Sequence, residues 1–431
     1  MRVFLETFGC QANERDSETI LGLLQTLGYE ACSGPEEADL IILNTCSIRE
    51  KAEQKVFSRL GTFRALKEDK PWLIIGLCGC MAQEAEMAGL IRRRCPYVDF
   101  ILGTQRLHTL PLMLQNIRSG LGFQSDTEET GEIVESLPSL RAYPFKALVN
   151  ITYGCNNFCT YCIVPYVRGR ERSRKLEDIL KESREKAAEG ALELMYLGQN
   201  VNAFGKTTGE SFPELLHRAQ DIPGLERIRY MTSHPRDFKE DLMEAIAACP
   251  KVSRHVHLPV QSGSSRILKR MNRGYSREDY LELAEKIRSK VPEAVLTTDI
   301  IVGFPGETDE DFADTLSLVE KVGYDSAFTF MYSPRKGTPA AAMENQVPLR
   351  EKKARLQELM GAQARAAAGL HEKLRGKTLR VLAESWSQGI LSGRADGNQL
   401  VHCPGGREQV GTFLDVTVTD PQTWMLKGEQ K

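Results

Sequence analysis

The sequence predicts an α/β protein with an N-terminal parallel α/β domain, a central partial (β/α)6 barrel and a small C-terminal all-β barrel of the OB-like type. Short apolar runs alternate with helically spaced segments over residues 1–118 and again over 143–368, which is typical of parallel sheets covered by helices. Residues 369–431 instead alternate polar and apolar positions between glycines, which indicates antiparallel strands. The 431 residues also exceed the roughly 250–300 that one hydrophobic core supports.

In the N-terminal domain, apolar runs that predict strands precede amphipathic segments that predict helices. The expected strands cover residues 3–8, 39–44, 72–77 and 98–102, and the expected helices cover 16–27, 51–66, 83–94 and 107–118. Cys10, Cys46 and Cys80 each follow one of these strands, and parallel strands present their carboxyl ends at one edge. We therefore expect the three thiols to lie together, although Cys78 is an alternative to Cys80 because both point to the same side of the chain.

Residues 119–142 are rich in acidic side chains and contain a single arginine, so they predict an irregular linker between domains. Six strand–helix repeats follow, and in such a barrel the chemistry belongs to the loops after the strands. The expected strands are residues 147–152, 192–197, 227–231, 256–259, 296–303 and 326–330; the expected helices are 176–188, 213–220, 240–248, 277–290 and 309–322. A basic helix over 349–375 leads to the C-terminal domain, with strands expected at 378–384, 399–401 and 412–419.

Composition excludes several classes of protein. Hydrophobic residues make up 41% and charged residues 26%, which excludes a disordered or collagen-like chain. The apolar runs are far shorter than the roughly 20 residues that cross a bilayer, and Glu6 interrupts any signal-like start, so we expect no membrane association and a cytoplasmic location. The net charge of −2 excludes a uniformly basic nucleic-acid binder. In a reducing compartment the 11 cysteines are expected to be ligands or ordinary thiols, not disulfides.

The densest chemical signal is the group Cys155, Cys159 and Cys162, which has the spacing C-x3-C-x2-C after the first barrel strand. Three buried thiols and a zinc site are the rival interpretations. Structural zinc usually has four ligands in paired spacings, and no second pair lies nearby. Thiolate ligation of an iron–sulfur cluster fits better. With three thiolates on four irons, one iron stays open to a small molecule.

This loop after the first barrel strand resembles that of the radical S-adenosylmethionine enzymes. The resemblance implies a [4Fe-4S] cluster whose open iron binds S-adenosylmethionine, which is then cleaved to a 5′-deoxyadenosyl radical. It also implies cofactor contacts from Tyr161, from Gln199 and Asn200 after the second strand, and from Gly303 after the fifth, where glycine lets the backbone approach adenine. For Tyr161, packing at the barrel mouth is an equally good interpretation.

The whole of residues 2–428 resembles the methylthiotransferase family within that superfamily. In this family the cysteines equivalent to Cys10, Cys46 and Cys80 hold a second [4Fe-4S] cluster connected with sulfur supply, and the β-rich tail is a TRAM domain, which binds RNA. Segments 44–57, 232–235, 258–264 and 332–339 are similar to the branch that modifies N6-isopentenyladenosine. Ala12 departs from the methionine often found there.

The resemblance implies methylthiolation at C2 of N6-isopentenyladenosine, next to the anticodon in tRNA. One S-adenosylmethionine would donate the methyl group and another would be the radical source. No catalytic residue is expected beyond the cluster ligands, and a flavodoxin- or ferredoxin-like reductase is the expected electron donor. The alternatives are threonylcarbamoyladenosine in tRNA, an aspartate of a ribosomal protein, or, in a different class, a non-catalytic iron–sulfur protein that binds RNA and senses redox state.

Two basic runs in the central domain are candidate contacts for the tRNA backbone, although most charge runs are simply solvated faces. The candidate RNA-binding residues are Arg168, Arg170, Arg172, Arg174, Arg266, Arg270 and Arg273. His255 and His257 are expected to be satisfied polar residues, not ligands.

Overall fold

The computed structural model describes residues 1–47, 50–84 and 86–431, with the backbone alone for 50–53. Ile48 and Arg49, which belong to the family-like segment 44–57, therefore lie outside the described residues. The described chain divides into two compact units, which we treat separately. The first contains Met1–Phe158, Cys162–Glu182 and Leu197–Gln199, and the second contains Cys159–Tyr161, Ser183–Tyr196 and Asn200–Lys431.

The first unit is built on a six-stranded parallel sheet with the order β2-β1-β3-β4-β5-β6. Its strands are β1 (Arg2–Thr7), β2 (Glu30–Ala31), β3 (Leu40–Thr45), β4 (Ile74–Gly79), β5 (Phe100–Leu102) and β6 (Gln124–Asp126). The helices are α1 (Gln11–Thr26), α2 (Glu50–Asp69), α3 (Met87–Arg94) and α4 (Leu110–Arg118). All four expected strands are confirmed. The central strands β3 and β4 are buried on both faces, as their continuous apolar runs predict.

The acidic segment 119–142 is more ordered than expected. Residues Gln124–Asp126 form the edge strand β6, and Asp126 pairs with Arg106 at 2.9 Å. Further along, Leu140 donates its backbone N–H to the Glu18 carbonyl of α1. The side chains of β6 are polar, so the sequence carries no apolar signal for this strand. Backbone pairing with β5 and the ion pair of Asp126 with Arg106 stabilise it instead.

The barrel strands are β7 (Lys146–Asn150), β10 (Glu193–Leu197), β11 (Arg227–Tyr230), β12 (His255–His257), β13 (Val295–Val302) and β14 (Ser326–Met331). In the first unit, β8 (Thr152–Tyr153) also pairs with β9 (Arg172–Ser173). The helices are α5 (Val164–Val167), α6 (Leu176–Ala188), α7 (Phe212–Ala219), α8 (Glu240–Ala248), α9 (Ser265–Arg270), α10 (Arg277–Lys290), α11 (Asp309–Val322) and α12 (Leu349–Glu372). Short α9 was not expected, because it falls in a basic run without amphipathic spacing.

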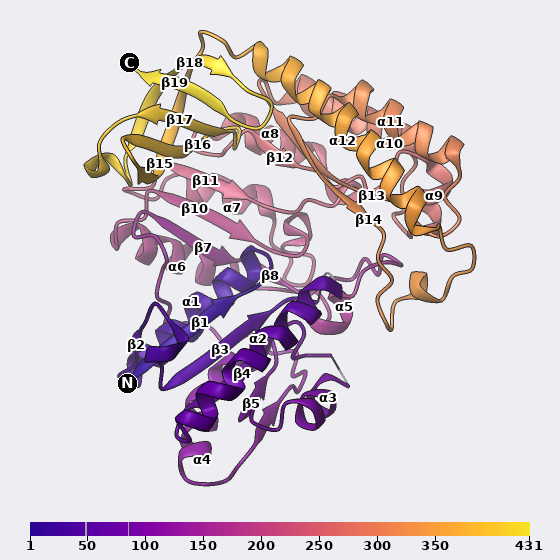
Figure 1. Cartoon of the computed structure of the whole chain (residues 1–431). Helices are drawn as coiled ribbons and strands as arrows, with labels where there is room; N and C mark the ends of the chain where they lie inside the picture. Colours follow the sequence, from indigo (N-terminus) through magenta and orange to yellow (C-terminus); the bar gives the residue numbers. More distant parts are fainter. Residues whose placement is uncertain (48–49, 85) are drawn as a thin grey trace. The chain divides into compact units, whose positions relative to one another are not determined.

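In the second unit, β10 pairs in parallel with β11, and β12, β13 and β14 form another parallel sheet. Helices α10, α11 and α12 lie on one side of the β12-β13-β14 sheet (Figure 1). The alternation of exposure along β13 agrees, since Ile300 and Val302 are buried while Asp299 and Ile301 are partly exposed. One face of this sheet therefore packs on helices, and the other is more open.

The C-terminal strands close into the barrel β15-β16-β17-β19-β18, drawn in yellow in Figure 1. They are β15 (Thr378–Ser387), β16 (Ile390–Ala395), β17 (Leu400–Pro404), β18 (Phe413–Pro421) and β19 (Leu426–Gln430). Buried Arg227 of β11 bonds to Asp396 in this barrel at 2.9 Å and to Glu193 at 2.6 Å. These contacts fasten the barrel to the strands β10 and β11. Among the described residues, no helix is both long enough and apolar enough to cross a membrane.

Candidate active site

The three N-terminal cysteines meet at the carboxyl edge of the first sheet. Cys10 follows β1, Cys46 follows β3 and Cys80 follows β4, and these strands are neighbours in the sheet. Gly9 and Gly79 permit the close approach. A Cβ on Gly9 would lie 2.8 Å from Cβ of Cys46, and one on Gly79 would lie 2.4 Å from the Thr45 carbonyl. Both glycines have positive φ, so the turns need glycine on conformational grounds as well. The three cysteine-bearing loops therefore lie at one edge of the sheet, and their joint role as ligands stays a prediction.

Asn13, in the first turn of α1, holds these strand ends together. Its amide nitrogen donates to the carbonyls of Phe8 (3.1 Å) and Thr45 (2.8 Å). Its Oδ1 lies 3.8 Å from Sγ of Cys10 and 3.9 Å from Sγ of Cys80. One buried amide thus brings two thiols to a common point and anchors the loop that bears the third. Cys78, the alternative ligand, is fully buried in the apolar cluster on the α1 side of the sheet. Burial raises its pKa strongly, which disfavours a thiolate.

Arg168 carries the positive charge of this site. Its guanidinium is buried and donates to Sγ of Cys80 at 3.2 Å and to Oδ1 of Asn13 at 2.9 Å, and it pairs with Asp16 at 2.7 Å. Burial raises the pKa of the Cys80 thiol, and Arg168 opposes that rise. The expectation that Arg168 contacts RNA is therefore wrong, because its donors are directed at internal partners.

The second cysteine group occupies the loop between β8 and α5, as expected. Gly154 begins the loop with a φ of +69°, and a Cβ there would lie 2.2 Å from the Arg170 carbonyl. The backbone N–H of Cys155 donates to the Gly169 carbonyl, and the backbone N–H of Asn157 lies 3.5 Å from Sγ of Cys155. Phe158 also has a positive φ. The backbone here is strained in the way that is often found around binding sites.

In the second unit, Cys159 has a buried arginine partner of its own. Arg273 donates to Sγ of Cys159 at 3.3 Å, to the Pro259 carbonyl at 2.6 Å and to the Tyr275 hydroxyl at 2.9 Å. Like Arg168, it is not available to RNA, which corrects that expectation. Tyr161 packs against a cluster formed by Ile267, Met271, Phe304, Tyr332 and Ala340. Both interpretations of Tyr161 remain compatible with this position at the barrel mouth.

The other residues expected to contact the cofactor differ in their exposure and in their contacts. Gln199 is partly exposed after β10. Asn200 is buried, its amide nitrogen donates to Asp237 at 2.7 Å, and its oxygen accepts the His234 backbone N–H at 3.1 Å. Gly303 has a φ of +70°, but the space beside it is filled by Lys352, whose Cγ would lie 2.4 Å from an added Cβ. Lys352 therefore fills the space that a side chain at position 303 would need, and the expected contact of the Gly303 backbone with adenine stays a prediction.

We expect the substitution Gly303→Ala to destabilise the second unit by about 1–3 kcal/mol, because alanine disfavours this backbone conformation and its Cβ would collide with Lys352. Thermal unfolding measures the effect. Gly323→Ala is a matched control with a similar φ and no atom within 4 Å of the new Cβ, so its cost should be smaller. Equal costs for the two variants would contradict the role given to Lys352.

The remaining arginines of the basic runs are divided between internal and exposed positions. Arg174 is buried and pairs with Glu135 at 2.5 Å and Glu182 at 2.6 Å, so it also is not an RNA contact. Arg172 is partly buried and donates to Gln105 at 3.0 Å. The more accessible candidates are Arg170, Arg266 and Arg270. Arg170 is exposed and stacks on Phe158, Arg266 pairs with Asp311 at the surface, and Arg270 is partly exposed near Gly306.

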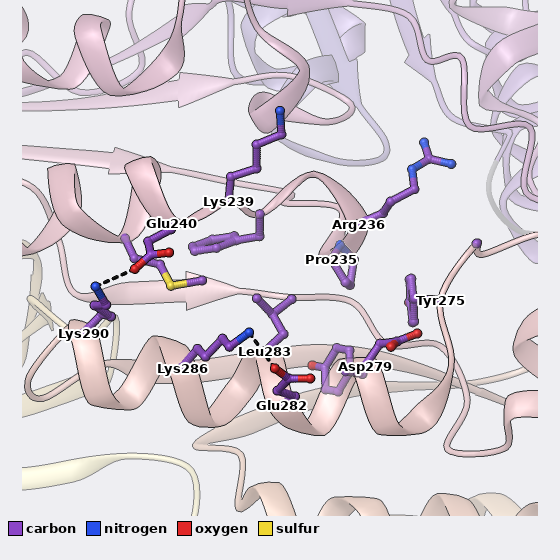
Figure 2. A pocket seen from close by; sticks show the side chains of 14 residues that line it. Pro235, Arg236, Lys239, Glu240, Tyr275, Asp279, Glu282, Leu283, Lys286 and Lys290 are labelled. Atoms are coloured by element: carbon purple, nitrogen blue, oxygen red, sulfur yellow. Dashed lines mark ion pairs between the residues drawn. The ribbon is translucent and has the colours of Figure 1, made fainter.

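A groove of 580 Å³ lies beside α8 and α10 in the second unit. Figure 2 shows that two of its lysines point toward acidic partners: Lys286 pairs with Glu282, and Lys290 pairs with Glu240, both at 2.6 Å. These two lysines are therefore matched by acidic side chains of the groove, which Arg236 and Lys239 also line.

The donor sets fit iron–sulfur ligation. Each group offers three cysteines, two of which directly follow a residue with positive φ, and each has a buried arginine N–H directed at one sulfur, the kind of hydrogen bond that such clusters receive. Within the described part of the chain, no three Cys, His, Asp or Glu side chains are close enough to hold a single metal ion.

Comparison with known proteins supports this architecture. Residues 149–319 match the Radical SAM superfamily model, residues 2–103 match the Uncharacterized protein family UPF0004 model, and residues 372–431 match the TRAM domain model. Among solved structures, the radical S-adenosylmethionine methyltransferase TsrM from Kitasatospora setae has a TM-score of 0.56 at 14% identity, covering 91% of this chain and 78% of that one. At that identity the likeness concerns the fold alone.

Fold and cysteine sites together define a radical S-adenosylmethionine enzyme of the methylthiotransferase class. The chain is 51% identical over 429 residues to the tRNA-2-methylthio-N(6)-dimethylallyladenosine synthase of Moorella thermoacetica, covering 98% of this chain and 97% of the relative. It is 49% identical over 433 residues to the enzyme of that name from Clostridium tetani, covering 99% and 96%. The chain therefore belongs to the family of tRNA-2-methylthio-N(6)-dimethylallyladenosine synthases.

Proposed function

We propose that this protein adds a methylthio group at C2 of N6-dimethylallyladenosine, also called N6-isopentenyladenosine, next to the anticodon in tRNA. The observation that carries this proposal is the near-identity in length and the 51% identity to a relative named for that product. The TRAM domain match supports RNA as the partner. The segments that favoured the isopentenyladenosine branch point to the same substrate.

The chemistry requires breaking an unactivated aromatic C–H bond, which no acid–base pair of side chains can do. When bound, S-adenosylmethionine and a cluster on Cys155, Cys159 and Cys162 supply a radical for that bond, while a second cluster on Cys10, Cys46 and Cys80 supplies sulfur. The chain's own contribution is to position these groups. Asn13 and Arg168 order the N-terminal thiols, and Arg273 orients Cys159. The methyl group would come from a further molecule of S-adenosylmethionine.

The substrate must leave its stack in the anticodon loop to reach a barrel interior. Arg170, Arg266 and Arg270 are the remaining candidates for backbone contacts, since the other arginines of the two runs are enclosed or partly enclosed. A flavodoxin- or ferredoxin-like reductase would supply electrons. A tRNA substrate and six thiols that must stay reduced both support a cytoplasmic location.

Replacing Cys46 with alanine should stop methylthio transfer while leaving reductive cleavage of S-adenosylmethionine intact, because Cys46 belongs to the N-terminal thiol group alone. Liquid chromatography of the nucleosides and of 5′-deoxyadenosine measures the two activities in one reaction. Cys95→Ala, which removes a buried thiol of the same unit away from the group, is the control and should retain both. Undiminished methylthio product from the Cys46 variant would remove that residue from the site.

The direct test of the proposed substrate is mass spectrometry of tRNA nucleosides from cells with and without this protein. Loss of 2-methylthio-N6-isopentenyladenosine, restored by the wild-type gene, is the expected result. Loss of the threonylcarbamoyl derivative instead, or no change in tRNA, would overturn the proposal and redirect it to the second tRNA branch or to a ribosomal protein. A non-catalytic sensor would show no turnover of S-adenosylmethionine under a strong reductant.

A further inference from the structure

The open face of the β12-β13-β14 sheet carries an aromatic side chain, Phe328, whose one ring contact is an edge contact with His257 at 6.1 Å between centroids, among the residues described. Phe328, in the middle of β14, is 56% exposed. Its neighbour across the sheet is Asp299, whose side chain is 27% exposed, and the two are paired in register. Burying a phenylalanine is normally favourable, so a ring this open on the edge strand β14 is available to contact a ligand.

A row of polar contacts leads along the sheet to Asp299. The Thr297 hydroxyl lies 2.7 Å from Nε2 of His255 and 3.0 Å from Nδ1 of His257. Nε2 of His257 lies 3.5 Å from Oδ1 of Asp299.

Only one arrangement of hydrogens serves all these groups when both imidazoles are neutral. His255 donates to Thr297, Thr297 donates to His257, and His257 directs its Nε2–H toward Asp299. The reverse arrangement would place an unprotonated ring nitrogen against a carboxylate. Asp299 is thereby held as an acceptor whose second oxygen remains available on the open face.

The same face leads toward the cysteine loop. Ile301 lies two residues beyond Asp299 on β13, which is roughly 6.6 Å along a strand. Ile301 and Tyr161 pack against the same apolar cluster. Asp299 and its strand neighbour Phe328 therefore lie about two residues along their strands from the apolar cluster that Tyr161 contacts.

We propose that Asp299 and Phe328 form the subsite that recognises the N6-dimethylallyl adenine base, an inference that rests on the proposed function. That base has one remaining hydrogen on N6 and a branched apolar five-carbon group. Asp299 is suited to accept the N6–H, and Phe328 is suited to cover the apolar group. An unmodified adenine offers the donor without the apolar group, so Phe328 determines the preference for the modified base.

The test compares binding of two anticodon stem-loop RNAs that differ only in the dimethylallyl group on one adenine. The reconstituted protein with S-adenosylmethionine is titrated with each RNA under anaerobic conditions, and fluorescence anisotropy gives the ratio of the two affinities. Wild-type protein should prefer the modified RNA. Phe328→Ala should reduce that preference by about 10-fold, in the range known for loss of one aromatic–base contact. Phe328→Leu, which keeps apolar surface, should give an intermediate ratio.

Asp299→Asn should weaken binding of both RNAs, because the N6–H acceptor loses its charge and both adenines have that hydrogen. Trp424→Ala is the matched control, since Trp424 is an equally exposed aromatic (58%) in the C-terminal barrel. It should leave the affinity ratio unchanged. Melting temperatures of the Phe328 variants should match wild type, because the side chain is exposed.

An unchanged ratio in Phe328→Ala, or a wild-type ratio near one, would overturn the subsite. Product analysis of the same samples keeps the two proposals separate. Formation of the methylthio product by wild type with an unchanged ratio in the variant would refute the subsite and leave the function standing. A clear wild-type preference lost in the variant, without methylthio product from wild type, would support the subsite and refute the function.

Discussion

Alanine in place of Cys159 should abolish reductive cleavage of S-adenosylmethionine, as should alanine at Cys155 or Cys162. A three-thiolate cluster that loses one ligand no longer keeps a single open iron for the cofactor. The expected loss is at least 1,000-fold, as is usual when a cofactor's ligand is removed and the uncatalysed reaction is very slow. The measurement is formation of 5′-deoxyadenosine under a strong reductant, together with iron content.

Cys32→Ala is the appropriate control for this experiment. Cys32 is partly buried after β2, and its backbone N–H donates to the Val3 carbonyl near the start of β1, whereas Cys10 follows the end of that strand. Its loss should leave cleavage at the wild-type rate. A Cys159 variant that still cleaves the cofactor at full rate would refute the assignment of the loop. Arg273→Lys offers a finer probe. It keeps the buried charge but replaces a fixed fork of donors, so the cluster should form with a changed reduction potential.

Arg168→Met should destabilise the first unit by about 3–5 kcal/mol, the usual cost of removing one partner from a buried ion pair. Asp16 would keep its charge while losing the guanidinium 2.7 Å away, and Asn13 Oδ1 would lose a donor. Thermal unfolding, followed by limited proteolysis of the first unit, measures the effect. A second measurement is the iron content of the Arg168→Met variant made in a protein that also carries Cys155→Ala. Because Cys155→Ala removes a ligand of the other group, the remaining iron reports on the N-terminal thiol group.

Two further variants separate charge from packing at this site. Asp16→Asn combined with Arg168→Met removes both charges, so a substantial part of the lost stability should return. Arg93→Met, an exposed arginine on α3 in the same unit, should change stability by less than about 0.5 kcal/mol. If Arg168→Met behaved like Arg93→Met, the buried pair would not be a stabilising element of the thiol site.

Local patterns of polar and apolar residues predicted most of the helices and strands. Amphipathic spacing predicted α6, α8, α10 and α11 at the bounds the structure has. Each of these helices shows an apolar stripe against charged residues, and α10 and α11 begin with capping boxes at Ser276 and Thr308. The polar edge strand β6 had no such signal, because backbone pairing to a neighbouring strand leaves no trace in side-chain periodicity.

The basic runs show where sequence reasoning reached its limit. Arg168, Arg174 and Arg273 read as solvent-facing RNA contacts, because arginines in a row are usually exposed. In the structure each is buried against partners distant in sequence: Asp16, Glu135 and Cys159 respectively. Water and internal acceptors both satisfy the donors of a guanidinium, so the sequence does not distinguish an exposed arginine from a buried one. The tertiary contacts decide between them.

The sequence by itself determined the three-part architecture and the loop of Cys155, Cys159 and Cys162, because strand periodicity and the C-x3-C-x2-C spacing are local properties of the chain. Its resemblance to the methylthiotransferase family added the N-terminal ligand set and the class of chemistry. Tertiary structure decided which groups serve those cysteines. Asn13 collects the ends of two strands, Arg168 and Arg273 reach sulfurs from far along the chain, and Asp299 and Phe328 become neighbours through strand register. These relations depend on the three-dimensional adjacency of segments, which no local pattern encodes.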